Sequence, residues 1–151
     1  HEHQDGTGLP RGLKGSNAVE RNRNAAPPIP TLVGEICAVA NTYDELLSGP
    51  QGKKLYMPDE AVARLQELAG TRLNKELVGL FLQVVPVYPM GMEVVVLDGA
   101  CSGYRGIVSQ VNPLELDMPV VTLIRDDTGA PIDPIEMDTG MECVPIRCLG
   151  F

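Results

Sequence analysis

The sequence is poor in aromatic and basic residues. It has 151 residues with no tryptophan and only 4% aromatic side chains, so aliphatic residues must build any core. Twelve Lys and Arg stand against 20 Asp and Glu, a formal net charge of −8. This excludes an extended nucleic-acid interface, which needs a basic stripe. The longest apolar run, residues 77–87, is interrupted by Gln83 and Pro86 and is too short to span a bilayer. We therefore expect a small molecule or another protein as partner, with neither nucleic acid nor membrane bound by this portion.

Cysteine and histidine are also scarce. The four cysteines show no framework spacing, and Cys143 and Cys148 lack a second close pair that would complete a zinc site. Reduced cysteines of this kind are typical of cytosolic proteins, so a cytoplasmic location is predicted. The only histidines are His1 and His3.

Helical patterns are confined to the first half of the chain. Residues 1–30 read as a loop rich in glycine and proline. Thr31 is a suitable N-cap for a helix to about residue 47, whose core face is predicted to be Leu32, Ile36, Val39, Tyr43 and Leu46. Two further helices are predicted over residues 57–70 and, capped by Asn74, residues 75–85.

The second half has β-strand character. Three β-branched runs, separated by turn residues, cover residues 92–99, 105–112 and 119–129. Residues 135–137 are a candidate for a fourth, short strand. The prediction is a small antiparallel β meander, too small to be stable unless it packs on something.

The first residues carry the clearest chemistry. His1, Glu2, His3 and Asp5 are side chains that suit iron, manganese or zinc, and the nearby glycines allow close backbone approach to a ligand. Two other interpretations remain open: a solvated acidic loop, and copper binding by a true N-terminal amine with histidine at position three.

The order of these residues resembles a known family. The segment His1-Glu2-x-x-Asp5-Gly6-x-Gly8-Leu9-Pro10 is similar to the signature His-His-Glu-x-x-Asp-Gly-x-Gly-Tyr-Pro of HD-GYP proteins, metal-dependent phosphodiesterases that hydrolyse cyclic di-GMP. Residues 36–44 resemble the family's Ile-x-Ala-Val-Ala-Asp-x-Tyr-Asp helix, and residues 44–61 its next loop and helix. Residues 87–113 resemble the extension that often follows the domain.

This resemblance implies an organisation. We expect an α+β chain in which residues 1–86 are the C-terminal helices of an all-α HD-type domain and residues 87–151 are a small β-rich extension. Because the family's signature has one more histidine before position 1, and further ligands upstream, we expect the chain to be a fragment of a longer protein.

The resemblance also implies a metal site. His1 would bind a divalent metal, iron or manganese, in the intact domain. Asn41 stands where the family has a ligating aspartate, and its neutral amide is a weaker ligand than a carboxylate. Asp44, one turn further along, is a candidate to support the site. A fragment without the other ligands is not expected to retain the metal.

Two surfaces would contact partners. Lys53 and Lys54 lie where the family often places a basic residue against the dinucleotide phosphates. The Gly-Leu-Pro loop (Gly8, Leu9 and Pro10) corresponds to a family loop linked to signalling partners of the diguanylate cyclase type.

Three functions follow from the resemblance. The first is a phosphodiesterase that converts cyclic di-GMP to pGpG or GMP. The second is a degenerate module that binds the dinucleotide or a signalling protein without hydrolysis. It is favoured by Asn41, by Leu9 and by Pro50, which stands where the family often has a phosphate-binding arginine. The third is an HD-type hydrolase of another phosphoester.

Overall fold

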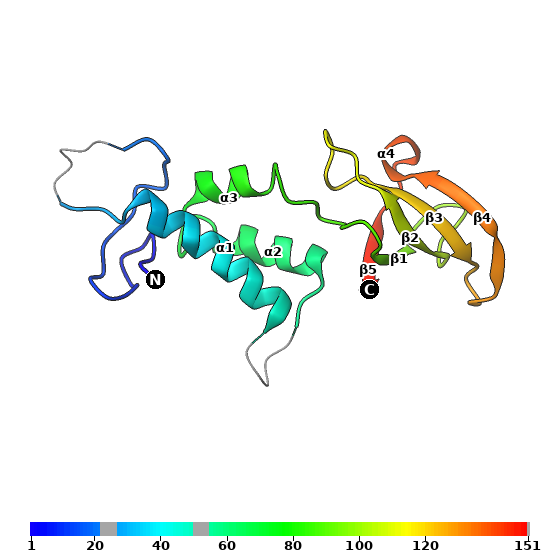
Figure 1. The fold of residues 1–151 in the computed structure, drawn as a ribbon, viewed down its shortest axis with the longest axis horizontal. Helices are drawn as coiled ribbons and strands as arrows, with labels where there is room; N and C mark the ends of the chain where they lie inside the picture. The colour runs from blue at the N-terminus through cyan, green and yellow to red at the C-terminus, as the bar shows by residue number, and fades with distance from the viewer. Residues whose placement is uncertain (22–26, 50–54, 151) are drawn as a thin grey trace. The chain divides into compact units, whose positions relative to one another are not determined.

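The computed structural model describes residues 1–21, 27–49 and 55–150 (Figure 1). Within them the elements are α1 (Leu32–Ser48), α2 (Pro58–Leu68), α3 (Lys75–Phe81), β1 (Glu93–Val96), β2 (Arg105–Gln110), β3 (Val120–Arg125), β4 (Pro131–Asp138), α4 (Thr139–Glu142) and β5 (Ile146–Gly150). The chain divides into two compact units. The first unit comprises His1–Tyr56 and Glu60–Val84, and the second comprises Met57–Asp59 and Val85–Phe151.

Local capping explains where the helices of the first unit begin. The Thr31 hydroxyl accepts from the Gly34 amide at the start of α1. The side-chain Oδ1 of Asn74 accepts from the Glu76 and Leu77 amides at the start of α3. Gly49, with φ of 56°, follows the end of α1. The predicted helices are confirmed, although α3 ends at Phe81, before the predicted limit.

The helices of the first unit share one apolar core. It contains Ala38, Val39, Leu65, Leu73, Leu77 and Val78, each at most 8% exposed. The prediction that Ile36 belongs to it is wrong, because Ile36 is 49% exposed while the neighbouring Glu35 is only 3% exposed. The N-terminal loop covers the side of α1 that carries Glu35 and supplies this carboxylate with polar partners, so Glu35 is buried and Ile36 faces solvent.

The second unit is built on a five-stranded antiparallel sheet of order β4-β3-β2-β1-β5. Alternate residues face a core that includes Val94, Val96, Val108, Val121 and Leu123, all at most 1% exposed. Strand β5, which was not predicted, returns to pair with β1.

The predicted fold class is wrong in its all-α HD-type domain. The described residues form four helices and a five-stranded antiparallel sheet, an α+β fold, and not the end of an all-α HD-type domain. The physical reason is that the β-branched runs after residue 92 pair across five strands and bury a core of their own. The predicted boundary between residues 86 and 87, with its two domain assignments, stays a prediction.

No helix in the described part of the chain combines the length and apolar character that crossing a bilayer requires. All four cysteines lie in the described part of the chain, where no disulfide joins them, and only Cys148 is buried.

Candidate functional site

The N-terminal loop folds back on itself so that its first residues lie beside its glycines. The Leu9 amide donates to the His1 carbonyl oxygen at 3.1 Å, and the Gly6 amide donates to the His3 carbonyl oxygen at 3.1 Å. A Cβ atom on Gly8 would lie 2.3 Å from the His3 nitrogen and 2.5 Å from the His1 oxygen, both in the backbone. Only glycine fits at position 8, because any side chain would push the histidines out of place.

Glu2 and Asp5 hold this loop in shape. The Glu2 carboxylate accepts from the amides of Arg11 and Leu13, each at 2.8 Å. Desolvation opposes its ionisation, but these hydrogen bonds and the nearby Arg11 charge together lower the pKa of Glu2. Asp5 accepts from the hydroxyl and the amide of Thr7, which lower its pKa.

His1 and Asn41 meet. The Asn41 Nδ2 atom lies 3.0 Å from His1 Nε2, so the loop places an imidazole against the middle of α1. The resemblance implied that both side chains serve one site, and the structure brings them together.

His3 takes part in a chain of polar contacts. Arg72 lies 3.5 Å from its Nε2, and Thr7 lies 3.0 Å from its Nδ1. Because arginine only donates, His3 Nε2 accepts from Arg72 and the Nδ1 proton is donated to Thr7. The Thr7 hydroxyl then donates to Asp5 at 2.7 Å. Asp5 thus fixes the orientation of the His3 ring through the Thr7 hydroxyl.

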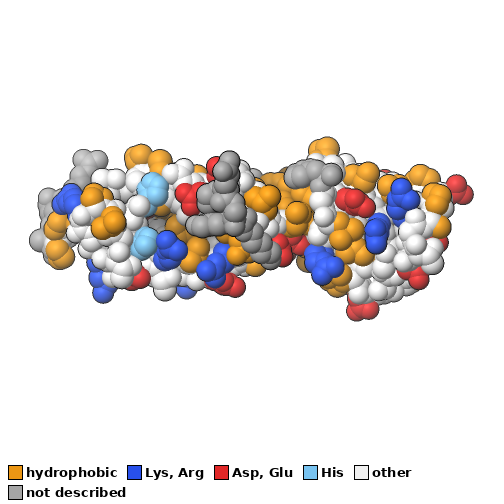
Figure 2. Space-filling view, turned by 90° about the horizontal axis from the view of Figure 1, so that it is seen from below, with side chains coloured by type: hydrophobic (Ala, Val, Ile, Leu, Met, Phe, Trp, Pro, Cys, Tyr) orange, Lys and Arg blue, Asp and Glu red, His pale blue; other side chains and the backbone are white. Residues whose placement is uncertain are grey.

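The first unit contains a pocket of about 510 Å³ that includes both histidines. Figure 2 shows both histidines (pale blue) on one face, with basic side chains (blue) beside them. The pocket is lined by His1, Glu2, His3, Ala38, Asn41, Thr42, Glu45, Leu46, Tyr56, Arg64, Leu68, Arg72 and Leu73. The sequence prediction missed Arg64 and Arg72, which lie in and after the second predicted helix; only their positive charge could have indicated them.

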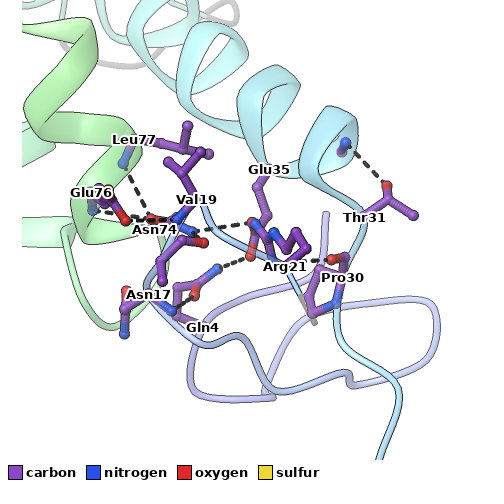
Figure 3. Close-up of polar contacts among 12 residues, drawn as sticks. Gln4, Asn17, Val19, Arg21, Pro30, Thr31, Glu35, Asn74, Glu76 and Leu77 are labelled. Atoms are coloured by element: carbon purple, nitrogen blue, oxygen red, sulfur yellow. Dashed lines mark hydrogen bonds and ion pairs between the residues drawn. The ribbon is translucent and has the colours of Figure 1, made fainter. Parts of the chain in front are cut away.

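A buried polar network holds the loop against the helices (Figure 3). Glu35 accepts from Gln4 Nε2 at 2.6 Å, from Asn74 Nδ2 at 3.2 Å and from Arg21, with which it forms an ion pair. Gln4, Glu35 and Asn74 are at most 3% exposed. Gln4 lies between His3 and Asp5, so Glu35 anchors the segment that carries both histidines. The sequence prediction assigned no role to Gln4 or Glu35.

No protein-family model matches the chain. The chain is 28% identical, over 152 residues, to a Pseudomonas aeruginosa protein named cyclic di-GMP phosphodiesterase PA4108; the match covers 100% of this chain and 33% of that protein. The two are distantly related. This chain therefore spans about a third of the length of its relative.

The other residues predicted from the resemblance lie outside the pocket or outside the described residues. Asp44 does not line the pocket and instead accepts from the Ser48 hydroxyl at 3.4 Å, whereas Glu45 lines it. Leu9 is 73% exposed and Pro10 is exposed beside it. Gly6, with φ of 82°, adopts a backbone conformation that favours glycine. Lys53 and Lys54 lie outside the described residues.

The described residues do not by themselves fit a metal cluster. Among them no three His, Cys, Asp or Glu side chains gather as a metal site. His1 offers one nitrogen ligand and Asn41 one neutral oxygen, and a catalytic metal needs at least three protein ligands. Metal binding by His1 and Asn41 stays a prediction.

Proposed function

We propose that the pocket of the first unit binds cyclic di-GMP and that the chain thereby serves cyclic di-GMP signalling. The observation that carries the proposal is the convergence of Arg64 and Arg72 with His1 and His3 on one pocket. The distant relationship to a cyclic di-GMP phosphodiesterase supports this choice of ligand. Assignment to the HD-GYP family, carried by the motif from His1 to Pro10, is part of the proposal.

The side chains of the pocket match the chemistry of the dinucleotide. Cyclic di-GMP carries two anionic phosphodiester groups, and a guanidinium group donates two parallel hydrogen bonds to phosphate oxygens. The Glu45 carboxylate can accept from the amino group of guanine. The pocket volume of about 510 Å³ is within the usual range for small-molecule sites.

Calorimetric titration of the chain with cyclic di-GMP tests this proposal. Arg72→Ala should weaken binding about tenfold or more, because a charge-assisted hydrogen bond and the support of His3 are lost. Lys75→Ala is the matched control, since this exposed residue at the start of α3 has the same charge and lies outside the pocket. Equal loss in both variants, or no binding by the unmodified chain, would overturn the proposal.

Hydrolysis of cyclic di-GMP is the second candidate function. The observation that favours it is the 3.0 Å separation of His1 and Asn41. That distance joins Asn41 Nδ2 to His1 Nε2, and the resemblance assigns both side chains to metal-ligand positions. The Asn41 carbonyl oxygen would have to face the cation, and further ligands would have to come from outside the described residues.

The variant Asn41→Asp separates binding from hydrolysis. We expect the unmodified chain to bind the dinucleotide without hydrolysing it. We expect the same of the Asn41→Asp variant, even when manganese or iron is added. Metal retained by the variant after gel filtration, together with linear pGpG detected by chromatography, would favour the phosphodiesterase.

The Gly-Leu-Pro loop is proposed to contact a signalling protein. The exposure of Leu9 supports this, because a 73% exposed leucine is available to a partner. The cytoplasmic location, the divalent metal of an intact domain and the contact of Lys53 and Lys54 with phosphate remain predictions.

A further inference from the structure

The basic residues of the second unit lie in one row. Residues 85–151 contain only three basic side chains, Arg105, Arg125 and Arg147, against ten acidic ones. Arg147 on β5 pairs with Val95 on β1, Val95 pairs with Arg105 on β2, and Arg105 pairs with Arg125 on β3.

A β-bulge brings Arg125 into this row. Leu123 on the same strand is 0% exposed and faces the core, so regular alternation would turn Arg125 inward as well. The register shifts between Arg105 and Gly106, where two residues of β3 oppose one of β2. Bulges re-aim side chains, and this one leaves Arg125 exposed and opposite Arg105.

The row of arginines lowers the stability of the second unit through charge repulsion. Like charges directly opposite each other on neighbouring strands are destabilising. Among the described residues, no ion pair joins any of the three arginines to an acid. Arg125 Nη1 donates to the Gly129 carbonyl oxygen, at 3.1 Å. Glu93, two residues from Val95 on β1, is the nearest acid along that strand. An anion lying over the row would offset the repulsion.

The surroundings of the row favour a protein as the source of that anion. Ile107 and Leu149 follow Arg105 and Arg147 by two residues on the same strands, beside the row, and are 40% and 38% exposed. Exposed apolar residues next to arginines are typical of protein interfaces. Outward positions of β1, β2 and β5 carry no aromatic ring on which a nucleic-acid base could stack. Figure 2 shows basic side chains of this unit exposed on one face, with hydrophobic ones (orange) between them.

The length of the row also fits an extended peptide. Three strand spacings separate Arg147 from Arg125, which is about 14 Å. Acidic residues at positions i, i+2 and i+4 of an extended segment point to one side and span about 13 Å. We propose that the outer face of the sheet, along Arg147, Arg105 and Arg125, docks an extended acidic segment of a partner protein.

Fluorescence anisotropy with a labelled Glu-Ser-Glu-Ser-Glu peptide tests the proposal on the whole chain. The peptide should bind, more weakly as salt increases, and Arg105→Glu or Arg147→Glu should weaken binding about tenfold or more. Glu93→Gln should strengthen it. Lys75→Glu in the first unit is the matched control, because it changes the net charge equally and should leave binding unchanged.

Three outcomes would overturn this docking surface. The first is an equal loss in the Lys75→Glu control, which would show a response to net charge alone. The second is undiminished binding by the two arginine variants when their folding is verified by hydrogen exchange. The third is tighter binding to phosphatidylserine vesicles or to pyrophosphate than to the peptide. None of these measurements uses cyclic di-GMP, so they are independent of the first proposal.

Discussion

At the centre of the first unit, Glu35 accepts hydrogen bonds from Gln4, Arg21 and Asn74, while being only 3% exposed itself. At the centre of the second unit, Val94, Val121 and Leu123 are 0% exposed and contact other apolar side chains. A polar network is directional and fails when one member is removed, because its partners stay buried without a bond. An apolar core loses stability in proportion to the atoms removed. The unit that holds the candidate pocket is therefore the one that depends on a few specific contacts.

Removal of the Glu35 carboxylate should have the largest effect. Glu35→Ala removes the carboxylate that accepts from the Arg21 guanidinium and from the side-chain amides of Gln4 and Asn74, which should destabilise the first unit by about 4 kcal/mol. Urea titration followed by amide hydrogen exchange should show loss of protection in the first unit alone. Glu67→Ala, at a 62% exposed side chain paired with Arg64, is the control and should change stability by less than about 0.5 kcal/mol. Equal loss of protection in both units would contradict the contrast between them.

Truncation of the apolar core should have the next largest effect. Leu123→Ala removes a fully buried side chain from the second unit and should destabilise it by about 3 kcal/mol. The same hydrogen-exchange experiment should show loss of amide protection in the sheet, while cyclic di-GMP binding in the first unit persists. Abolition of that binding would contradict the expectation that the apolar core stabilises the second unit alone.

The smallest expected effect is a pH dependence confined to the second unit. Desolvation, together with the negative charges of Asp59, Cys148 and Asp117, raises the pKa of Tyr88 from 10.0 to about 12. Its hydroxyl donates to the Ile146 carbonyl oxygen at 2.9 Å. Below pH 10 the phenol is neutral in both states and its contribution is fully present; between pH 10 and about 12 only the unfolded state ionises, so stability falls.

Thermal unfolding of the wild type and of Tyr88→Phe between pH 9 and pH 12 measures this contribution. The variant should be slightly less stable at pH 9, because the hydrogen bond to Ile146 is lost, and should show a shallower decline above pH 10. Parallel declines would show that Tyr88 does not titrate in this window.

Features encoded by neighbouring residues were predictable. The caps at Thr31 and Asn74 and the β-branched runs of β1, β2 and β3 were found because each signal lies within a few residues of the element it determines. Strand β5 was missed because it is short, follows Pro145 and has its partner in β1, far away in the sequence. The fold class failed because a local resemblance was extended to the architecture of the whole chain.

The candidate site was predictable only in part. The motif pointed to His1 and Asn41, which lie together, but Arg64, Arg72 and Glu35 gained their places from tertiary contacts. Glu35 is buried only because Gln4, Arg21 and Asn74 reach it from three separate segments. Periodicity along α1 alone favours Ile36 for burial, and the predicted core followed that preference.

The pairing of β5 with β1 has a consequence for how the second unit assembles. Hairpins join β1 to β2, β2 to β3 and β3 to β4, whereas Val96 meets Ile146 only after about fifty intervening residues. Closure of so long a loop is slow compared with the formation of a hairpin. The last strand should therefore dock onto a preformed four-stranded intermediate, and β1 is left as an open edge, prone to intermolecular pairing, until it does.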